Sequence, residues 1–476
     1  MSVRDYEAVI GLEVHVELKT GRKIFCACPA EFGVKPNTNV CPICLGMPGA
    51  LPVLDSLAVE YAVRAGAALN CRINNVSAFD RKNYFYPDLP KGYQITQYFT
   101  PICEGGFVPI ETDGEKRSIG LERIHIEEDA GRLVHRGSTT EIDYNRCGVP
   151  LIEIVSLPDI RTPAEAKAYL TSLRRMLLFA GVSDCRMNEG SLRCDVNISL
   201  RRRGDSDYGV KCEIKNVNSI NYVGRALEYE IERQAELLDR GETVPAETRR
   251  YNEDSGRTER MRAKEAVVDY RYFAEPNLPP LVLSDEYINE VKRHLPKMPD
   301  EICAELIDEF GIKPEIAYLI TEEPDTAEYF MECALATEYK PTCANLFVGE
   351  VMAKLPENGG RYIKPEYLAE ICALLAEGRV VSGSAKELIH LSFMRDESPL
   401  ELAKTENMLK MTDEAAIGGI VDEVILENER TIADIKRGKT NAKKQLIGGV
   451  MRKTGGLADP SVVQKIIDER ISAMLS

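Results

Sequence analysis

The sequence contains no apolar run long enough to cross a bilayer, which takes about 20 residues. Its first seven residues, Met1 to Glu7, lack the apolar core of a secretory signal. These two absences argue against a membrane or secreted protein and predict a cytoplasmic location. Internal repeats and low-complexity tracts are also missing, and 44% hydrophobic with 29% charged residues is typical of a soluble globular protein.

An excess of positive charge is lacking too. The formal net charge of the 476 residues is −16, so the overall charge does not indicate nucleic-acid binding. Net charge is an average, however, and a local basic face can still bind phosphates. One such stretch lies between Lys436 and Lys453, where seven basic residues occur without an acidic one.

The 14 cysteines are not expected to form disulfides, because the chain is long and shows no secretion signal. Most stand alone and are interpreted as small buried apolar residues. Four are clustered as Cys26-Ala27-Cys28, twelve further residues, and Cys41-Pro42-Ile43-Cys44. Two close pairs of thiolates can complete a tetrahedral zinc site, and such a closed site has a structural role. The alternative is four free buried cysteines.

The first 293 residues combine strand and helix patterns. Apolar and polar residues alternate in 14–18 and 124–127, which predicts strands. A long helix is predicted after Thr162, with Pro163 in its first turn, Glu165 completing a capping box and Gly181 ending it. A second amphipathic helix is predicted over 225–238.

Proline-rich segments from residue 276 to 299 mark the end of this region, and strand signals vanish beyond them. Short helices are expected over 294–405. The segment 406–476 has an acidic and then a basic half, and ends in a helix capped by Asp459 and Pro460. The predicted fold class is therefore α+β, with a mixed domain over 1–293, a helical domain over 294–405 and a helical tail over 406–476.

The strongest candidate for chemistry is the strand Leu12-Glu13-Val14-His15-Val16. Glu13, His15 and Glu17 share the face opposite the apolar residues. Carboxylates with one imidazole suit a divalent cation that holds a triphosphate. For an isolated Glu-x-His, a strand with a solvated face is the better interpretation.

Two further segments favour the metal. Acidic residues crowd Ile124-His125-Ile126-Glu127-Glu128-Asp129, and Glu153 lies inside an apolar run. A buried carboxylate requires a cation, a metal or a hydrogen-bond donor. The alternative for Glu153 is a salt bridge to Arg123 or Arg146.

Two other motifs do not fit the functions that they suggest. Gly438-Lys439-Thr440 resembles a phosphate loop, but the required first glycine is Ala433 and the preceding segment is predicted helical. Ser382 to Lys386 faintly resembles an amidase nucleophile without its glycine-rich framework, and Ser384 is interpreted as a helix N-cap. No Cys/His glutaminase arrangement stands out either. The chain thus shows a phosphoryl-transfer site but no means of producing ammonia.

Taken together, the sequence resembles the GatB family, the B subunit of the aspartyl/glutamyl-tRNA(Asn/Gln) amidotransferase. The resemblance spans nearly the whole chain and is densest before about residue 290. It is carried by VIGLEVHVEL at 9–18, FDRKNYFYPD at 79–88, HIEEDAG at 125–131, DYNR at 143–146, PLIEI at 150–154, EGSLRCDVN at 189–197, KN at 215–216 and DYRYF at 269–273.

This resemblance implies a cradle domain related to the catalytic fold of glutamine synthetase, a helical domain and a YqeY-type tail. It implies ATP-dependent phosphorylation of the side-chain carboxylate of Glu or Asp carried by tRNA(Gln) or tRNA(Asn). Ammonia then displaces phosphate. A partner amidase (glutaminase), the A subunit, supplies the ammonia from glutamine, and a small third protein, the C subunit, completes a heterotrimer.

The family's magnesium ligands fall on Glu13, His15, Glu128 and Glu153, which are the expected catalytic residues. Asp195, Glu213 and Lys215 lie in matching motifs and are candidates for contacts with ATP or substrate. The zinc cysteines occur in only part of the family, so zinc is expected but not required for the chemistry.

In the tail, a contact with the tRNA backbone is expected for Lys436, Arg437, Lys439, Lys443 and Lys444. The tail departs from the family where Gly456-Leu457-Ala458-Asp459-Pro460 lacks the lysine of a Gly-Lys-Ala-Asn-Pro-like sequence.

Two alternatives belong to other classes of protein. A free-standing ATP-dependent ligase for a small amino acid would consume ATP with free glutamate, and the basic tail argues against it. A non-catalytic, zinc-containing tRNA-binding protein would tolerate Glu13→Gln or Glu153→Gln, and the clustered carboxylates argue against that.

Overall fold

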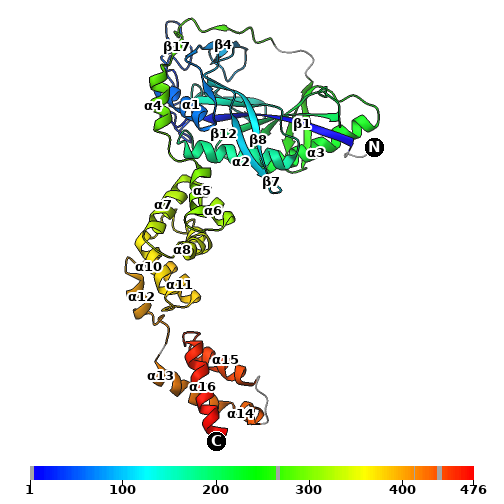
Figure 1. The fold of residues 1–476 in the computed structure, drawn as a ribbon. Coiled ribbons are helices and arrows are strands. Elements are labelled where there is room, and N and C mark those ends of the chain that lie inside the picture. Colours follow the sequence, from blue (N-terminus) through cyan, green and yellow to red (C-terminus); the bar gives the residue numbers. More distant parts are fainter. Residues whose placement is uncertain (1–4, 264–268, 412, 437–441, 476) are drawn as a thin grey trace. The chain divides into compact units, whose positions relative to one another are not determined.

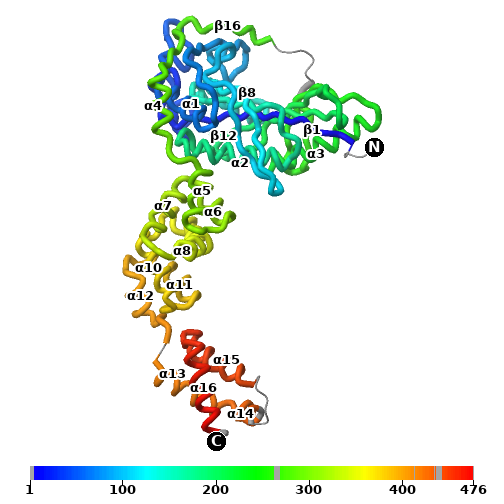
Figure 2. Tube along the Cα trace, viewed as in Figure 1, coloured from blue at the N-terminus to red at the C-terminus, as the bar shows by residue number. Residues whose placement is uncertain are grey.

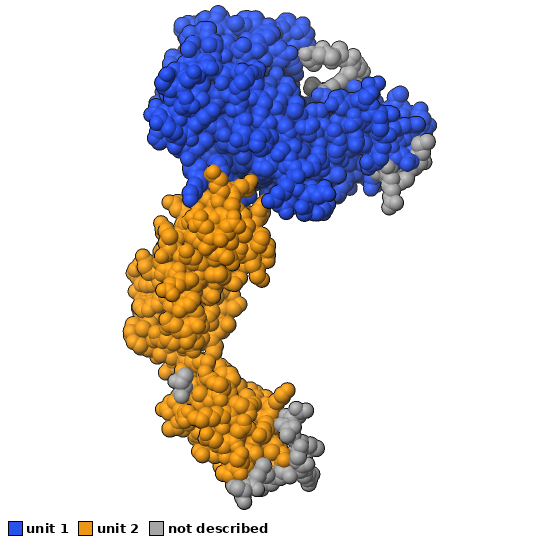
Figure 3. Space-filling view, in the orientation of Figure 1, with its two compact units in different colours: residues 1–299 blue, residues 300–476 orange. Residues whose placement is uncertain are grey.

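The computed structural model describes residues 5–263, 269–411, 413–436 and 442–475. The chain forms two compact units, Met1–Pro299 and Asp300–Ser476 (Figure 3). We refer to them as the N-terminal and C-terminal units and describe each by itself. The predicted domain boundaries near residues 293 and 405 stay predictions.

A ten-stranded sheet is the centre of the N-terminal unit (Figure 1). Its strand order is β15-β14-β13-β12-β1-β11-β8-β6-β2, and β7 pairs with β8 outside this path. The strands are β1 (Tyr6–Glu17), β2 (Arg72–Ile73), β6 (Cys103–Glu104), β7 (Phe107–Thr112), β8 (Glu115–Glu128), β11 (Pro150–Ser156), β12 (Leu192–Arg202), β13 (Cys212–Val217), β14 (Glu247–Asn252) and β15 (Arg257–Ala263).

The long strand β1 lies inside this sheet and pairs antiparallel with β11 on one side and β12 on the other. Figure 2 shows its extended path through the N-terminal unit in dark blue. Leu12, Val14 and Val16 are buried, whereas Glu13 and His15 between them are partly exposed. The alternation predicted from the sequence is therefore confirmed, and it gives the sheet one apolar and one polar face.

Helices cover the apolar face and share one hydrophobic core with it. They are α1 (Ser56–Ala68), α2 (Pro163–Phe179), α3 (Ile220–Asp239) and α4 (Asp285–Arg293). The Thr162 hydroxyl accepts a hydrogen bond of 3.1 Å from the Glu165 amide, which confirms the predicted cap of α2. Helix α3 begins at Ile220, earlier than predicted, because Ser219 caps it.

Smaller sheets lie beside this layer. They are β16-β4-β5, β17-β3 and β10-β9. Their strands are β3 (Val76–Ser77), β4 (Asp80–Asn83), β5 (Tyr93–Thr96), β9 (Arg132–Arg136), β10 (Thr139–Asp143), β16 (Phe273–Ala274) and β17 (Leu281–Val282).

The described part of the C-terminal unit is helical and has two separate hydrophobic cores. The first core joins α5 (Pro299–Asp308), α6 (Pro314–Ile320), α7 (Pro324–Leu335), α8 (Lys340–Leu346), the π-helical turn η2 (Phe347–Val351), α9 (Met352–Lys354), α10 (Pro365–Ala376), α11 (Ser382–Met394) and α12 (Pro399–Thr405). The second joins α13 (Glu414–Glu427), α14 (Glu429–Lys436), α15 (Lys443–Lys453) and α16 (Pro460–Leu475).

Two predicted caps in this unit have different outcomes. Asp459 caps α16 by accepting a hydrogen bond of 2.8 Å from the Ser461 amide, as predicted. The N-cap prediction for Ser384 is wrong, because α11 already begins at Ser382 and Ser384 lies in its first turn. The α+β fold class is confirmed. Within the described residues, no helix combines the length and the hydropathy that a membrane span requires.

Candidate functional site

The polar face of the large sheet gathers ionisable side chains from neighbouring strands. In the register of β8, β11 and β1, His125 lies opposite Glu153 and Glu153 lies opposite His15. On the other side of β1, Glu13 lies opposite Asp195 of β12. Because side chains directly opposite in a sheet share a face, these residues lie on one face of four neighbouring strands, with the Glu13/Asp195 pair two residues along β1 from His15.

The first group on this face consists of His15, Glu127 and Glu153. The Nε2 atom of His15 lies 3.4 Å from Glu153 Oε2 and 3.7 Å from Glu127 Oε1. One ligand atom from each residue lies within 4.8 Å of the others. Ligand atoms around an octahedral Mg²⁺ are about 3 to 4 Å apart, so a small closure of this group would accommodate the ion.

The charged residues of this group and the adjacent His125 shift one another's pKa values. Burial alone would raise the pKa of Glu153, but His125 and His15 hold it well below its ordinary value. Burial alone would lower the pKa of His15, and the hydrogen bond and charge of Glu153 raise it instead. Burial also opposes protonation of His125, yet Glu153 and Glu127 raise its pKa to about 9. The carboxylate of Glu153 is therefore ionised and available to a cation.

A second group consists of Glu13, Asp195 and Glu213 and adjoins the first through β1. The ammonium of Lys215 forms ion pairs with Asp195 and, at 3.1 Å, with Glu213. Asn197 Nδ2 donates a hydrogen bond of 2.9 Å to Glu13. Burial, and then the charge of Glu153, raise the pKa of Glu13. The structure thus brings together the three weaker candidates from the sequence, with Lys215 balancing the two carboxylates.

The structure does not bring Glu128 to this face. Its side chain is buried on the opposite side of β8, where it pairs with Lys91 and accepts a hydrogen bond of 2.9 Å from the Ile95 amide. The neighbouring residue, Glu127, takes the place predicted for it. Of the four predicted magnesium ligands, Glu13, His15 and Glu153 therefore share this face and Glu128 does not, and the ligand set itself stays a prediction.

Strand parity would have revealed this from the sequence. Near the end of β8, Ile124 and Ile126 are buried in the core, so His125 and Glu127 share the other face, where the register pairs His125 with Glu153. His125 was missed as a member of the site for the same reason, although its ring lies 3.4 Å from Glu153. Neither Arg123 nor Arg146 pairs with Glu153 among the described residues, and Arg146 contacts Asp129 instead.

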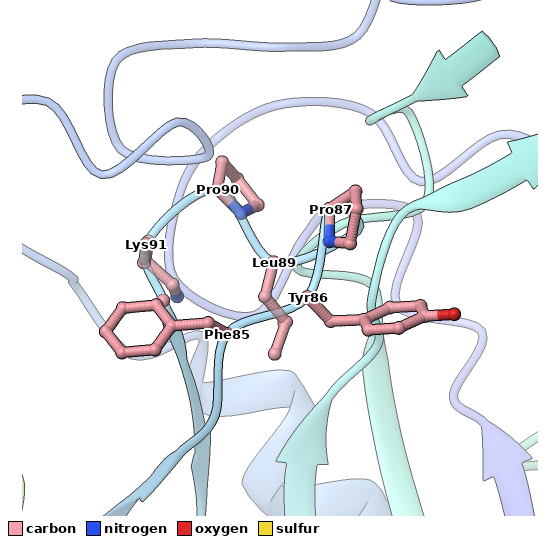
Figure 4. Close-up of a pocket in the computed structure, with 7 residues that line it drawn as sticks. Phe85, Tyr86, Pro87, Leu89, Pro90 and Lys91 are labelled. Atoms are coloured by element: carbon pink, nitrogen blue, oxygen red, sulfur yellow. The ribbon is translucent and has the colours of Figure 1, made fainter. Parts of the chain in front are cut away.

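A pocket of about 370 Å³ lies elsewhere, on the loop between β4 and β5 (Figure 4). Its lining residues are Phe85, Tyr86, Pro87, Leu89, Pro90, Lys91 and Gly92. None of the ionisable residues on the polar face lines it, so this pocket is not the candidate site. In Figure 4 the rings of Phe85 and Tyr86 extend to opposite sides of the loop.

The four clustered cysteines converge as predicted. The Sγ atom of Cys44 lies 3.6 Å from that of Cys26, 3.7 Å from that of Cys41 and 3.9 Å from that of Cys28. A tetrahedral zinc with bonds of about 2.3 Å places its sulfur atoms about 3.8 Å apart, so the cluster fits this metal. Hydrogen bonding from Cys26 lowers the pKa of Cys44 to about 4, which makes it the thiolate of the group.

A buried lysine accompanies this cluster. Lys23 is 1% exposed, and its ammonium lies 3.4 Å from Cys44 Sγ and 3.2 Å from the Tyr144 carbonyl oxygen. An ammonium buried without a carboxylate partner requires another negative group, and the thiolate supplies it.

The loop that carries the cysteines is also tied to the segment before β11. Asn39 N donates to Asn145 at 2.8 Å, and Asn37 N donates to Asp143 at 3.0 Å.

The predicted basic residues of the tail differ in their surroundings. Lys443 is paired with Asp468 at 2.7 Å, whereas Lys444 is exposed. Lys436 is the last residue of α14, and Arg437 and Lys439 lie outside the described residues. Of the predicted tRNA contacts whose burial the structure describes, Lys443 is partly exposed and Lys444 is exposed.

Comparison with known proteins covers nearly the whole chain. Residues 8–289 match the family described as the GatB/GatE catalytic domain, and residues 328–471 match that described as the GatB domain. The polar face and the four cysteines all lie within the first match.

Curated relatives agree with these matches. A protein from Thermoanaerobacter pseudethanolicus is 48% identical over 98% of this chain and 99% of its own length. Proteins from Carboxydothermus hydrogenoformans and Clostridium botulinum (strain Loch Maree) are 44% and 46% identical, each over 99% of this chain and all of their own. All three are named as the B subunit of aspartyl/glutamyl-tRNA(Asn/Gln) amidotransferase, and at this identity and coverage the chain belongs to that family.

Proposed function

We propose that the polar face of the large sheet is an ATP-dependent kinase site for the side-chain carboxylate of Glu or Asp carried on tRNA(Gln) or tRNA(Asn). The observation that carries the proposal is the pair of adjoining groups, His15/Glu127/Glu153 and Glu13/Asp195/Glu213, on neighbouring strands. Two anionic groups side by side suit cations that hold a triphosphate.

Mg²⁺ would be held there by the carboxylates of the two groups and would offset the negative charge that develops during phosphoryl transfer. The chain's own residues position the reactants. The acidic groups would hold the cation. Asn197 orients Glu13 by its hydrogen bond, and His125 orients Glu153 from the neighbouring strand β8. Lys215 provides a positive charge beside Asp195 and Glu213 that would attract a phosphate oxygen.

In the proposed reaction, a carboxylate oxygen of the charged amino acid attacks the γ-phosphorus of ATP. The bond between this phosphorus and the β–γ bridging oxygen breaks, and ADP leaves with the electron pair. Ammonia then attacks the acyl carbon, phosphate departs with the C–O electron pair, and the nitrogen loses a proton. The product is the amide, Gln or Asn, still esterified to tRNA.

The ammonia comes, in this proposal, from glutamine hydrolysed by a partner amidase, the A subunit of a cytoplasmic heterotrimer whose third member is the small C subunit. Because the curated relatives are named as one subunit of an amidotransferase, they support a complex of several chains. The cysteine cluster holds a structural zinc, which fits its sulfur–sulfur distances and its tie to the segment before β11.

The test measures ADP formation by the complex with ATP and Mg²⁺. We expect ADP with Glu-tRNA(Gln) or Asp-tRNA(Asn) and none above background with free glutamate or aspartate. Running both tRNAs separately identifies the substrate. Equal ADP formation with a free amino acid would instead indicate a free-standing ligase, and no ADP with either tRNA would refute the kinase site.

The tail contributes to tRNA binding in this proposal through Lys444 and its basic neighbours. Lys444→Gln should weaken tRNA binding and reduce the slope of log K against log salt by about 0.9 for one lost phosphate contact. Lys465→Gln is the matched control, since Lys465 is paired with Glu414 at 2.8 Å. Deleting 406–476 should flatten the salt dependence further. An unchanged slope in both variants would place the tRNA contact elsewhere.

A further inference from the structure

Four tyrosines lie together beside the polar face of the sheet, and neither the packing of the core nor the kinase site accounts for them. Tyr84 follows β4, Tyr98 follows β5, and Tyr270 and Tyr272 precede β16. We refer to these four residues as the aromatic wall. The rings of Tyr98 and Tyr272 are stacked with centroids 4.0 Å apart and planes inclined by 7°.

The other rings of the wall contact one another edge to face. Tyr270 lies 6.0 Å from Tyr272 and 5.8 Å from Tyr84, at angles of 65° and 69°. Tyr98 remains 43% exposed, and the more exposed ring of Phe99 leans edge-on against it at 5.1 Å. The wall is therefore ordered by its own contacts and still presents ring surface to solvent.

Lys82 connects the wall to the carboxylates. Its ammonium lies 5.0 Å from the ring centre of Tyr270 and 6.0 Å from that of Tyr84. Burial alone would lower the pKa of Lys82, but Glu127 and then Tyr272 and Glu153 raise it. The geometric link between the wall and the face that carries His125 is Arg123.

Arg123 contributes a positive charge beside the aromatic wall. It precedes His125 by two residues on β8 and so shares the polar face. Its guanidinium carbon lies 5.9 Å from the ring centre of Tyr98. Its Nε atom is buried and has no hydrogen-bond partner, and no carboxylate pairs with it among the described residues. Arg193 on the same face also has a buried Nε without a partner, but its guanidinium is paired with Asp129 at 2.6 Å, so Arg123 differs by lacking a carboxylate partner.

Stacked aromatic rings next to a guanidinium are the arrangement by which proteins bind a single nucleotide. The base stacks on a ring face, and the guanidinium pairs with a phosphate. An unsatisfied buried N–H is costly, so the position of Arg123 is best explained by an anion that satisfies it.

We propose that the aromatic wall and Arg123 form a subsite for an adenine nucleotide, with the base against Tyr98 and Tyr272 and a phosphate on Arg123. The inference rests on the proposed function, because both of its substrates contain this unit. ATP carries one adenine nucleotide, and the charged amino acid is esterified to the terminal adenosine of tRNA.

The experiment uses the whole complex and measures KM for ATP and KM for Glu-tRNA(Gln) or Asp-tRNA(Asn) separately. Tyr98→Ala should raise one of these KM values by roughly 5- to 100-fold, the range that stacking of one base supports. Tyr98→Phe keeps the ring and should restore the wild-type value. Arg123→Met should raise the KM for the same substrate as Tyr98→Ala.

Tyr208→Ala is the matched control, because Tyr208 is also exposed and lies 5.8 Å from an arginine, Arg201, but precedes β13 away from the wall. Its KM values should not change.

A raised KM for charged tRNA alone assigns the subsite to the terminal adenosine, and a raised KM for ATP alone assigns it to ATP. Both results support the proposal. Unchanged KM values in Tyr98→Ala and Arg123→Met would overturn it.

Failure of this inference can be separated from failure of the proposed function. If the wild-type complex forms no ADP with either charged tRNA, the kinase site itself is refuted. If it does, and the wall variants behave like wild type, only the nucleotide subsite is refuted. If Tyr98→Ala folds poorly, Arg123→Met replaces it in the test. Equilibrium dialysis with a non-hydrolysable ATP analogue adds a measurement of ATP binding that does not depend on catalysis.

Discussion

The carboxylate groups and the cysteine cluster both gather metal-binding side chains in the N-terminal unit, but they are built in opposite ways. The cysteines come from two short stretches of one loop region, and their sulfur atoms lie at nearly the spacing of a bound zinc. The carboxylates come from separate strands, and internal cations such as Lys215 and His15 contact them. The cysteine cluster encloses one metal-sized position. In the carboxylate groups, a bound metal ion can take over the contacts that Lys215 and His15 make with the carboxylates.

This difference indicates what a metal would do in each site. A four-thiolate site leaves no position for water or substrate, so a metal bound there would only stabilise the fold. Oxygen ligands with one imidazole would hold a hard cation that can still bind phosphate oxygens. Changes in the first site should therefore affect stability, and changes in the second should affect activity.

The largest effect is expected for Glu153→Gln, which should lower the rate of ADP formation by more than about 100-fold. The reason is that Glu153 faces both His15 and His125 and belongs to the first group. Single-turnover assays with labelled ATP measure it. Cys41→Ser should instead lose bound metal and thermal stability. A Glu153→Gln complex that is fully active would contradict the assignment of the two sites.

A sharper test compares substitutions of two adjacent residues, Glu127 and Glu128. Glu128→Gln leaves Lys91 buried without its charged partner and should cost about 3 kcal/mol of stability. Glu127→Gln should produce the larger loss of activity, because Glu127 faces His15. Chemical denaturation and the ADP assay on both variants test this. The reverse pattern would show that Glu128, and not Glu127, belongs to the site.

The smallest effect is expected in the cysteine cluster. Purified protein should contain one zinc per chain, and Lys23→Met should weaken its retention by about 10-fold, since the ammonium beside Cys44 balances the charge of the thiolates. Competition with a coloured chelator measures this. Lys19→Met, at an exposed position, is the control. Equal zinc release from both variants would exclude this role for Lys23.

Local patterns predicted much of this structure from the sequence. Alternation identified the strands around Glu13 and His125, the Thr162 cap located α2, and the spacing of Cys26 to Cys44 indicated the metal site. Each of these depends on residues close together in the chain.

The rest depends on pairing between distant strands. The position of Glu13 opposite Asp195 needs the register of β1 and β12, which no local pattern contains. Alternation within β8 separates Glu127 from Glu128, but placing Glu127 beside His15 and Glu153 needs the register of β8 and β11. The pairing of Lys443 with Asp468 likewise needs the packing of α15 against α16, which composition alone does not reveal.

Strand β1 has a consequence for the evolution of this chain. It carries members of both groups on one face and core residues such as Leu12 and Val14 on the other. It pairs with β12 from Tyr6 to Val16 and with β11 from Glu13 to Glu17. Losing or gaining one residue within Val9–Gly11 would turn Glu13 and His15 into the core and Leu12 and Val14 toward the substrate. Descendants can therefore change residues along β1 one by one, but its length is fixed, and natural insertions should be confined to the loops beyond its ends.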